Sequence, residues 1–335
     1  MVIDILTLPQ FTELDIQAPR GHQNSGGGMA CLMNAAKAVL SNRYRVNICV
    51  DFSDLKSDIV IIDAVLFAKL DETGSFQPEK LFELLQNDKN EHPKRRYLLW
   101  CAEMTMIRLP SRIRGQIIEL VDAIAVTDPY IWNLFRAIGI TPMGYLCDCI
   151  DPDLFRPGEK EMIVTAVGAL KHIKNVDWII EIYKLLEGKI KRTYFGSAAL
   201  WSSENRPEDN ALIPKIEAVT EAYYPSASPV EVAYYNSKAA FAVNNTWHDC
   251  SSRSNEELLM SGVISIHGEH PLFDPRPGFR IKTPQEAVEK IAELTDNFTR
   301  LPDPKLHEDS RDWALRNVST QSFMAQFENL MRSIL

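Results

Sequence analysis

The polar segment at residues 244–257 holds the side chains best suited to chemistry. It contains Asp249, Ser251, Ser252 and Arg253, and seven residues separate Asp249 from Glu257. The amino terminus of a helix presents free N–H groups and a positive dipole end to an anion. The two acids are therefore spaced to bracket a polar ligand whose phosphates lie on the amides between them. The alternative is that Asp249 is a solvated loop acid and that Glu257 only complements the helix dipole.

The sequence around this segment predicts the elements that position it. Residues 239–243 and 263–266 are short apolar runs of the length expected for buried strands. A helical pattern starts at Glu256, and Ser254 or Asn255 is suited to cap that helix. The result is a β-α-β crossover, in which ligands bind at the carboxyl ends of the strands.

A second candidate is the glycine-rich segment near the amino terminus. Gly26, Gly27 and Gly28 lie between a predicted strand at residues 2–8 and a predicted helix at residues 29–40. Glycines let backbone approach a ligand closely. The spacing is neither GxGxxG nor that of a P-loop, so a flexible loop without a ligand is the open alternative.

A third candidate follows the predicted strand at residues 97–100. Glu103 comes directly after this strand, and Arg108, Arg112 and Arg114 come next. An acid just beyond the carboxyl end of a strand is in a place where active-site groups occur. The alternative is that Glu103 is an ion-pair partner for these arginines.

Composition restricts the class of protein. The 335 residues carry a formal net charge of −9, which argues against a surface built wholly to hold nucleic acid but allows a local basic patch. The chain has no apolar run of membrane-spanning length and no basic start of a signal peptide, so we expect a cytoplasmic protein without a transmembrane segment. The six cysteines form no CxxC pair, and we expect them to be reduced and structural.

Strands and helices alternate in both halves of the chain, with a proline-rich break at residues 151–158. Residues 211–222 are predicted to be a helix, and residues 311–335 one or two closing helices. The pattern predicts two doubly wound, Rossmann-like α/β domains facing a cleft. We expect the first domain at residues 1–157, the second at 158–310, and terminal helices at 311–335 that pack back on the first domain.

Five blocks of sequence share motifs with one enzyme family. These are residues 122–127 (DAIAVT, like "ADAVVAVS"), 150–157 (IDPDLFRP, like "VDxxxFxP"), 167–175 (VGALKHIKN, like "VGRLxxxKG"), 194–196 (YFG, like "hhGxG") and 257–266 (ELLMSGVISI, like "EAMACGVPVI"). On these blocks the chain resembles the GT-B glycosyltransferases, particularly the large retaining, family 4-like group that uses sugar nucleotides as donors. In the family's register, Asp249 and Glu257 form its acid-x7-Glu pair.

The resemblance implies a role for each matching residue. Glu257 would hold the ribose hydroxyls of the nucleotide, Asp249 would face the donor sugar, and Lys174 would neutralise charge on the leaving phosphate. Amides of the segment that includes Ser251, Ser252 and Arg253 would cradle the diphosphate.

The same resemblance implies roles for Gly168 and for residues 26–28, and it shows that one cationic residue of the family motif is replaced in this chain. Gly168 belongs to the block that opens the donor domain, and residues 26–28 would let the first domain close over the diphosphate. The family's arginine in "VGR" is Ala169 here. Lys171 and Arg253 are the candidates to replace its charge.

The implied reaction is transfer of a hexose or pentose from a nucleotide-diphosphate sugar, with a UDP-sugar as the favoured donor, to an acceptor hydroxyl. The resemblance implies retention at the anomeric carbon, no permanently bound cofactor and no metal. No DxD motif follows a predicted strand.

The sequence leaves two classes of acceptor open. One is a glycan, lipid or small molecule. The other is hydroxymethylated pyrimidine in DNA, because residues 100–103 (WCAE) and 108–110 (RLP) are distantly similar to a segment of bacteriophage DNA glycosyltransferases. Glu103 would then lie by the acceptor hydroxyl, and residues 94–96 with Arg108, Arg112 and Arg114 would contact phosphates. A third hypothesis is a catalytically inactive sugar-nucleotide-binding protein, with Ala169 as its mark.

Overall fold

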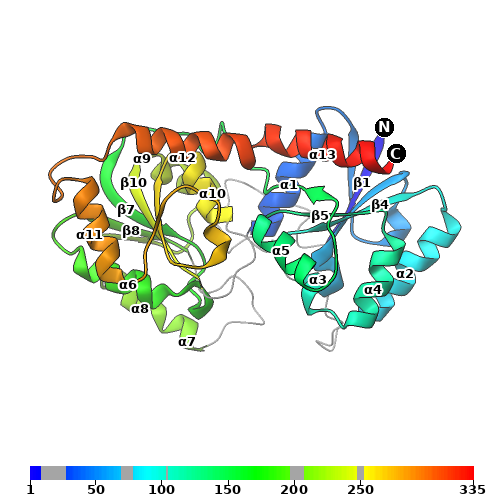
Figure 1. Cartoon of the computed structure of the whole chain (residues 1–335), viewed down its shortest axis with the longest axis horizontal. Coiled ribbons are helices and arrows are strands. Elements are labelled where there is room, and N and C mark those ends of the chain that lie inside the picture. Colours follow the sequence, from blue (N-terminus) through cyan, green and yellow to red (C-terminus); the bar gives the residue numbers. More distant parts are fainter. Residues whose placement is uncertain (9–27, 69–77, 103–104, 197–206, 247–252) are drawn as a thin grey trace. The chain divides into compact units, whose positions relative to one another are not determined.

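The computed structural model describes residues 1–8, 28–68, 78–102, 105–196, 207–246 and 253–335. The chain divides into two compact units. The first holds the described residues of 1–14, 29–149 and 320–335, and the second holds Gly28 and those of 150–319. Each unit contains one parallel six-stranded sheet (Figure 1).

The first sheet has the strand order β2-β1-β3-β4-β5-β6, and every neighbouring pair is parallel. The strands are β1 (Val2–Leu6), β2 (Arg45–Cys49), β3 (Ile59–Asp63), β4 (Arg96–Cys101), β5 (Ala123–Val126) and β6 (Gly144–Tyr145). All residues of β3 are buried, as expected for a central strand covered on both faces. This order reverses direction at β1, which is the mark of a doubly wound sheet.

Helices connect these strands. They are α1 (Gly28–Leu40), α2 (Pro78–Glu91), α3 (Thr105–Arg108), α4 (Ser111–Leu120), α5 (Pro129–Ala137) and the terminal α13 (Thr320–Ile334), with short 3-10 turns η2 (Phe52–Asp54) and η3 (Ala64–Ala68). Local sequence sets the helix starts. The α5 helix begins after Asp128, whose carboxylate accepts a hydrogen bond from the amide of Tyr130, and Pro129 occupies the first turn.

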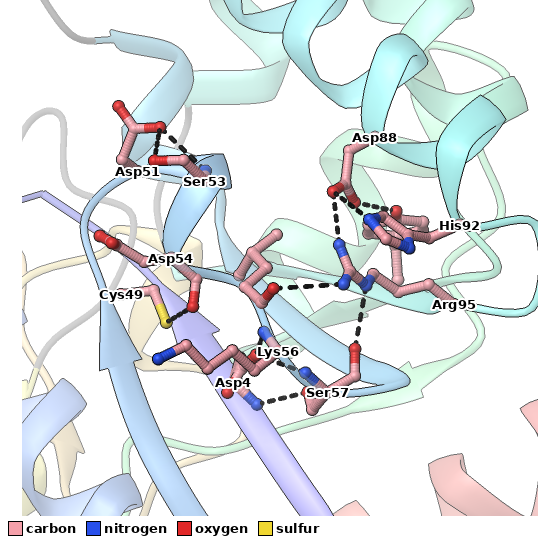
Figure 2. A network of polar contacts seen from close by, with 12 residues as sticks. Asp4, Cys49, Asp51, Ser53, Asp54, Lys56, Ser57, Asp88, His92 and Arg95 are labelled. Atoms are coloured by element: carbon pink, nitrogen blue, oxygen red, sulfur yellow. Dashed lines mark hydrogen bonds and ion pairs between the residues drawn. The ribbon is translucent and has the colours of Figure 1, made fainter.

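A polar network fastens the amino ends of the first sheet (Figure 2). The Asp4 carboxylate accepts hydrogen bonds from the amides of Lys56 (2.6 Å) and Ser57 (2.8 Å). Arg95 reaches the same turn, because its Nε donates to the carbonyl oxygen of Ser57 at 2.9 Å and its Nη1 pairs with Asp88. Both charged groups are thus compensated within the unit, as buried charges must be. This end of the sheet is built for stability.

The opposite end of β3 carries a buried carboxylic acid. Asp63 is the last residue of β3 and is fully buried. It accepts hydrogen bonds from the Thr7 hydroxyl at 2.8 Å and from the Val65 amide at 3.1 Å. Burial raises the pKa of Asp63 to about 6 despite these two bonds. Ionised Asp63 therefore costs stability at neutral pH.

The second sheet has the strand order β12-β11-β10-β7-β8-β9 and is also parallel throughout. Its strands are β7 (Glu161–Val167), β8 (Lys191–Phe195), β9 (Ala222–Tyr224), β10 (Ala239–Asn244), β11 (Ile264–His267) and β12 (Phe279–Arg280). Every residue of the central β10 is buried. Figure 1 shows the alternation of strands and helices around it.

Two hydrophobic cores lie on the two faces of the second sheet. The larger one contains residues of α6 (Val176–Leu185), α8 (Leu212–Glu217) and α11 (Pro284–Leu294). The smaller one contains Val232 of α9 (Pro229–Lys238) and Leu258 of α10 (Arg253–Met260). The remaining helices are α7 (Pro207–Asn210) and α12 (Pro304–Asn317). No helix among the described residues is long and apolar enough to cross a bilayer.

The structure confirms two doubly wound α/β units but corrects two element predictions. The predicted helix at residues 211–222 is wrong at its end, because α8 stops at Glu217 and the edge strand β9 starts at Ala222. Tyr223 and Tyr224 favour a strand once β8 offers an edge for pairing. The closing segment begins at Pro304, where Asp303 caps α12.

We predict that Asp63→Asn stabilises the protein at pH 8. The folded-state pKa lies above 3.8, the ordinary value for an aspartic acid, so the penalty for ionised Asp63 is absent below pH 3.8, grows up to about pH 6 and is complete above it. The asparagine still accepts from the Val65 amide and carries no charge. Urea denaturation at pH 8 should show a gain of up to about 3 kcal/mol, whereas pH 3.5 should show almost none. Destabilisation at pH 8 would contradict this account of Asp63.

Candidate functional site

The helix α10 carries Glu257 at the carboxyl side of the second sheet. The side chain of Glu257 is 1% exposed, and its Oε1 lies 3.2 Å from Nε of Arg253, one turn earlier in the same helix. Arg253 is itself 12% exposed. The two predicted ligand-binding residues therefore form an ion pair on the same face of α10, with Glu257 buried and Arg253 partly buried.

The predicted start of this helix is wrong. The structure already includes Arg253 in α10, so Ser254 and Asn255 lie inside the helix rather than at its cap. The buried Oδ1 of Asn255 accepts hydrogen bonds from Nδ2 of Asn244 (3.0 Å) and from Oγ of Ser265 (3.1 Å). Asn255 thereby ties α10 to both neighbouring strands, β10 and β11. The sequence gives one indication of these contacts, because Asn244 and Ser265 are polar residues in strands that are otherwise largely apolar.

A second buried ion pair on α10 was not foreseen from the sequence. Oε1 of Glu256 lies 2.6 Å from Nη2 of Arg276, and the two side chains are 3% and 2% exposed. Arg276 also donates to the carbonyl oxygen of Leu272, at the short turn η5 (Pro271–Phe273). The adjacent acids of α10 thus have different arginine partners, and Glu256 fixes the helix in place.

Two glycines bring the ends of β7 and β8 together. Gly168 has φ +153°, and its amide donates to the carbonyl oxygen of Phe195 at 2.9 Å. A Cβ atom placed on Gly196 would lie 1.7 Å from the carbonyl oxygen of Gly168. No side chain fits at Gly196, so bare backbone lines this part of the sheet edge.

The lysines predicted to bind phosphate follow β7 at the same edge. Lys171 precedes the turn η4 (His172–Lys174), and both lysine side chains are half-buried. The amide of His172 donates to Oδ1 of Asp209 at 3.0 Å, which fixes the turn. Because β7 pairs in parallel with β10, the segments that follow these strands leave the same edge of the sheet. The structure thus brings Gly168, Lys171 and Lys174 to the edge where α10 follows β10.

Several predicted site residues lie outside the described part of the chain. They are Gly26, Gly27, Glu103, Asp249, Ser251 and Ser252. Gly28 is described and is the first residue of α1. The roles of these residues stay predictions.

The arginines after β4 have different surroundings. Nη1 of Arg114 donates to the carbonyl oxygens of Ile107 (3.1 Å) and Leu109 (3.2 Å). Arg114 thereby fastens α4 to the end of α3. Arg108 and Arg112 have exposed side chains on these two helices. Two of the three predicted acceptor-binding arginines are therefore accessible.

The basic turn at residues 94–96 is not an extension of this group. Arg95 is 5% exposed and is bound to Asp88, Ser57 and Leu55, so the prediction that it contacts a phosphate is wrong. Arg96 pairs with Asp122 at 3.0 Å. This turn precedes β4, whereas α3 follows it, so the two basic segments lie at opposite ends of a strand.

The described residues contain no group of three or more His, Cys, Asp or Glu side chains placed to hold a metal ion. Cys49, Cys101, Cys147 and Cys149 are buried.

We predict that Glu256→Ala lowers the free energy of unfolding by about 3 to 5 kcal/mol, because it leaves the buried Arg276 guanidinium without this carboxylate. The double variant Glu256→Ala/Arg276→Met should recover part of that loss, since it removes the uncompensated charge. Urea denaturation of the two single variants and the double variant gives the coupling energy. Additive losses would contradict a specific pair.

Comparisons with known proteins place the fold. No family model matches the chain, and no curated protein matches it in sequence. Solved structures do match. HepE from Anabaena, in complex with UDP-glucose, has a TM-score of 0.70 at 10% identity over 99% of this chain and 100% of its own.

Two other structures match over a similar length. An alpha-glucosyltransferase in complex with UDP and a 13-mer DNA has a TM-score of 0.68 at 14% identity, over 99% of this chain and 100% of its own. Sucrose-phosphate synthase from Thermosynechococcus elongatus has a TM-score of 0.66 at 14% identity, over 99% and 98%. The chain therefore has the GT-B fold that its sequence motifs indicated.

Proposed function

We propose that the chain is a glycosyltransferase that moves a sugar from a nucleotide-diphosphate sugar to an acceptor hydroxyl. The observation that carries the proposal is the edge of the second sheet where α10 and the Lys171–Lys174 turn follow two adjacent parallel strands. This edge combines bare glycine backbone, basic side chains and a buried carboxylate. A nucleoside diphosphate needs this combination, since it carries two phosphates and a vicinal diol.

Each part of the donor has a proposed partner at this edge. Arg253, Lys171 and Lys174 supply positive charge for the diphosphate, near the positive end of the α10 dipole. Glu257 accepts hydrogen bonds from the ribose hydroxyls. A carboxylate has about four acceptor sites, so its contact with Arg253 is compatible with this role.

The reaction follows from this placement. As the bond between the anomeric carbon and the diphosphate oxygen breaks, negative charge grows on the leaving phosphate, and Lys174 stabilises that charge. Lys171 and Arg253 compensate for Ala169, which replaces the arginine of the resembled motif. We propose that Asp249 faces the donor sugar and that residues 26–28 close over the diphosphate.

The donor is proposed to be a UDP-sugar. HepE and the alpha-glucosyltransferase were solved with UDP-glucose and UDP, which supports this choice by analogy of fold. Transfer with retention, without a metal and without a permanently bound cofactor is proposed on the sequence motifs alone.

Lys174→Ala should lower turnover of UDP-glucose by about 100-fold while UDP binding weakens much less, because the charge that Lys174 stabilises develops mainly in the transition state. The measurement is donor-dependent release of UDP, with calorimetry for binding. Lys184→Ala, on the exposed surface of α6, is the matched control and should behave as wild type. Unchanged turnover in Lys174→Ala would remove Lys174 from the mechanism, and UDP binding without turnover in the wild type would favour the inactive-binder hypothesis.

Glu257→Gln should weaken UDP binding by about 10-fold or more, since hydrogen bonds to a charged acceptor contribute about 1.5 to 3 kcal/mol. Because Glu257 is buried, each binding measurement needs a thermal unfolding measurement on the same sample. Glu181→Gln on α6 is the control for loss of a carboxylate. Equal affinity of the Gln variant and the wild type for UDP would contradict the ribose contact.

DNA carrying a hydroxymethylated pyrimidine is the second candidate acceptor. The exposed Arg108 and Arg112, on the carboxyl side of β4, favour it, because enzymes that modify a base need a local cationic surface. Glu103 is proposed to lie by the acceptor hydroxyl.

Transfer of labelled glucose from UDP-glucose decides between the acceptor classes. If the acceptor is DNA, label should appear on hydroxymethylated DNA and not on unmodified DNA. Arg108→Ala/Arg112→Ala should then reduce labelling at moderate salt. Label on a glycan or lipid extract with none on modified DNA would eliminate the DNA acceptor.

A further inference from the structure

Three consecutive carbonyl groups at the carboxyl end of α10 each meet a different basic side chain. Arg311 donates to the carbonyl oxygen of Met260, and Lys160 Nζ donates to that of Ser261 at 2.8 Å. Nδ1 of His307 lies 2.7 Å from the carbonyl oxygen of Gly262. The last carbonyls of a helix have no partner within the helix and carry its negative dipole end. Basic groups therefore satisfy this end of α10 from outside.

Arg311 also holds the segment by which the chain enters the second unit. Its guanidinium donates to the carbonyl oxygens of Pro152 (3.0 Å) and Phe155. That segment is a compact turn, because the amide of Phe155 donates to the carbonyl oxygen of Asp151 at 3.0 Å and the Phe155 side chain is buried. The planar, five-donor fork of arginine suits one side chain to bridge several carbonyls. Arg311 is thus a direct link between this turn and α10.

Two of the places where the chain passes between the units, at Ile150 and after Ser319, are adjacent within the second unit. The chain enters at Ile150 and leaves after Ser319. The amide of Ile150 donates to the carbonyl oxygen of Val318 at 2.7 Å, and Ile150 and Ser319 form a parallel bridge. Arg311 lies on α12, the helix that leads to Ser319. Both crossing segments and the end of α10 therefore share one set of polar contacts.

The end of α10 is closely packed against α12 and the entering segment. Gly262 ends α10 with φ +69°, a conformation that glycine adopts without strain. A Cβ atom there would lie 3.3 Å from both the carbonyl oxygen of His307 and Cγ of Pro157. Even one methyl group would press on α12 and on the entering segment together.

Burying these basic side chains at the end of α10 costs free energy. Burial lowers the pKa of Lys160 to about 7. The pKa of His307 is lowered by burial and by the neighbouring Lys160, although its bond to Gly262 acts in the other direction. Apolar side chains would avoid this cost, so the basic groups serve the carbonyls that they contact.

We propose that Arg311 is a positioning residue for the donor site, which fixes α10 from its carboxyl end and couples it to the segments that connect the two units. This rests on the proposed function only where it concerns donor binding. Arg311 acts through α10, because Glu257 lies one turn before Met260 on that helix. Loss of Arg311 releases the helix end and the 151–155 turn together.

Amide hydrogen exchange tests the coupling without reference to activity. In Arg311→Met, exchange should rise by about 10-fold or more in residues 253–262 and in 151–157, and should stay at the wild-type level in the first sheet. Arg311→Lys keeps the positive charge but lacks the planar guanidinium that bridges several carbonyl groups. It should therefore recover only part of the protection from exchange. Arg316→Met, also on α12 and exposed, is the matched control. A rise in 151–157 alone, or a uniform rise throughout the chain, would overturn the coupling.

UDP binding tests the consequence for the donor site. Calorimetry should show affinity reduced by about 10-fold in Arg311→Met, with partial recovery in Arg311→Lys. If Arg311→Met does not fold, Arg311→Lys keeps the charge but reaches fewer of the carbonyl oxygens, and should show the same paired change in exchange at smaller amplitude. Wild-type protein that binds no UDP would refute the proposed function, and the exchange measurement would still decide the coupling. Altered exchange with wild-type UDP affinity would refute the positioning role.

Discussion

The hydrogen bonds of Asn255 are the constraint on which the proposed site depends. Its buried Oδ1 joins α10 to β10 and β11, and the Glu256–Arg276 pair fixes the same turn from another side. An amide oxygen or a charge left unsatisfied at such depth would cost several kcal/mol, on the order of 1 to 5. These interactions hold the first turns of α10 in one register, with Glu257 and Arg253 on one face. The helix is thus fixed at its start by polar contacts within the sheet and at its end by the basic groups around Met260, Ser261 and Gly262.

The parallel order of the second sheet brings the residues of the candidate site together. Its parallel strands end at a common edge, so the residues that follow β7 and β10 become neighbours although some 80 positions separate them in sequence. Gly168 and Gly196 keep that edge free of side chains, and the turn with Lys171 and Lys174 supplies charge. In the first sheet the amino ends are tied by Asp4 and Arg95, whereas the carboxyl side has Asp63 and the exposed Arg108 and Arg112. The stabilising polar network and the candidate acceptor-binding arginines thus lie at opposite ends of the strands.

The sequence was sufficient for the fold and for the elements that position the candidate site. Apolar runs of strand length around residues 239–266 predicted the β10-α10-β11 unit, because a fully buried strand is apolar throughout. It was insufficient where tertiary contacts decide. Asn255 is a good helix cap by type, but its side-chain oxygen accepts hydrogen bonds from two strand side chains, which hold it inside the helix. Arg95 looked like a phosphate ligand because sequence does not show that Asp88 neutralises it. The strand β9 was missed because three residues at a sheet edge owe their conformation to pairing with β8.

We propose that a nucleoside diphosphate binds at the carboxyl edge of the second sheet. Hydrogen exchange of the wild-type protein with and without saturating UDP tests it most directly, because ligand contacts slow exchange where they form. The account predicts protection in residues 168–175 and in α10 (Arg253–Met260), the two segments that follow β7 and β10. Saturable binding with protection confined to the first sheet, or no protection at all, would contradict it.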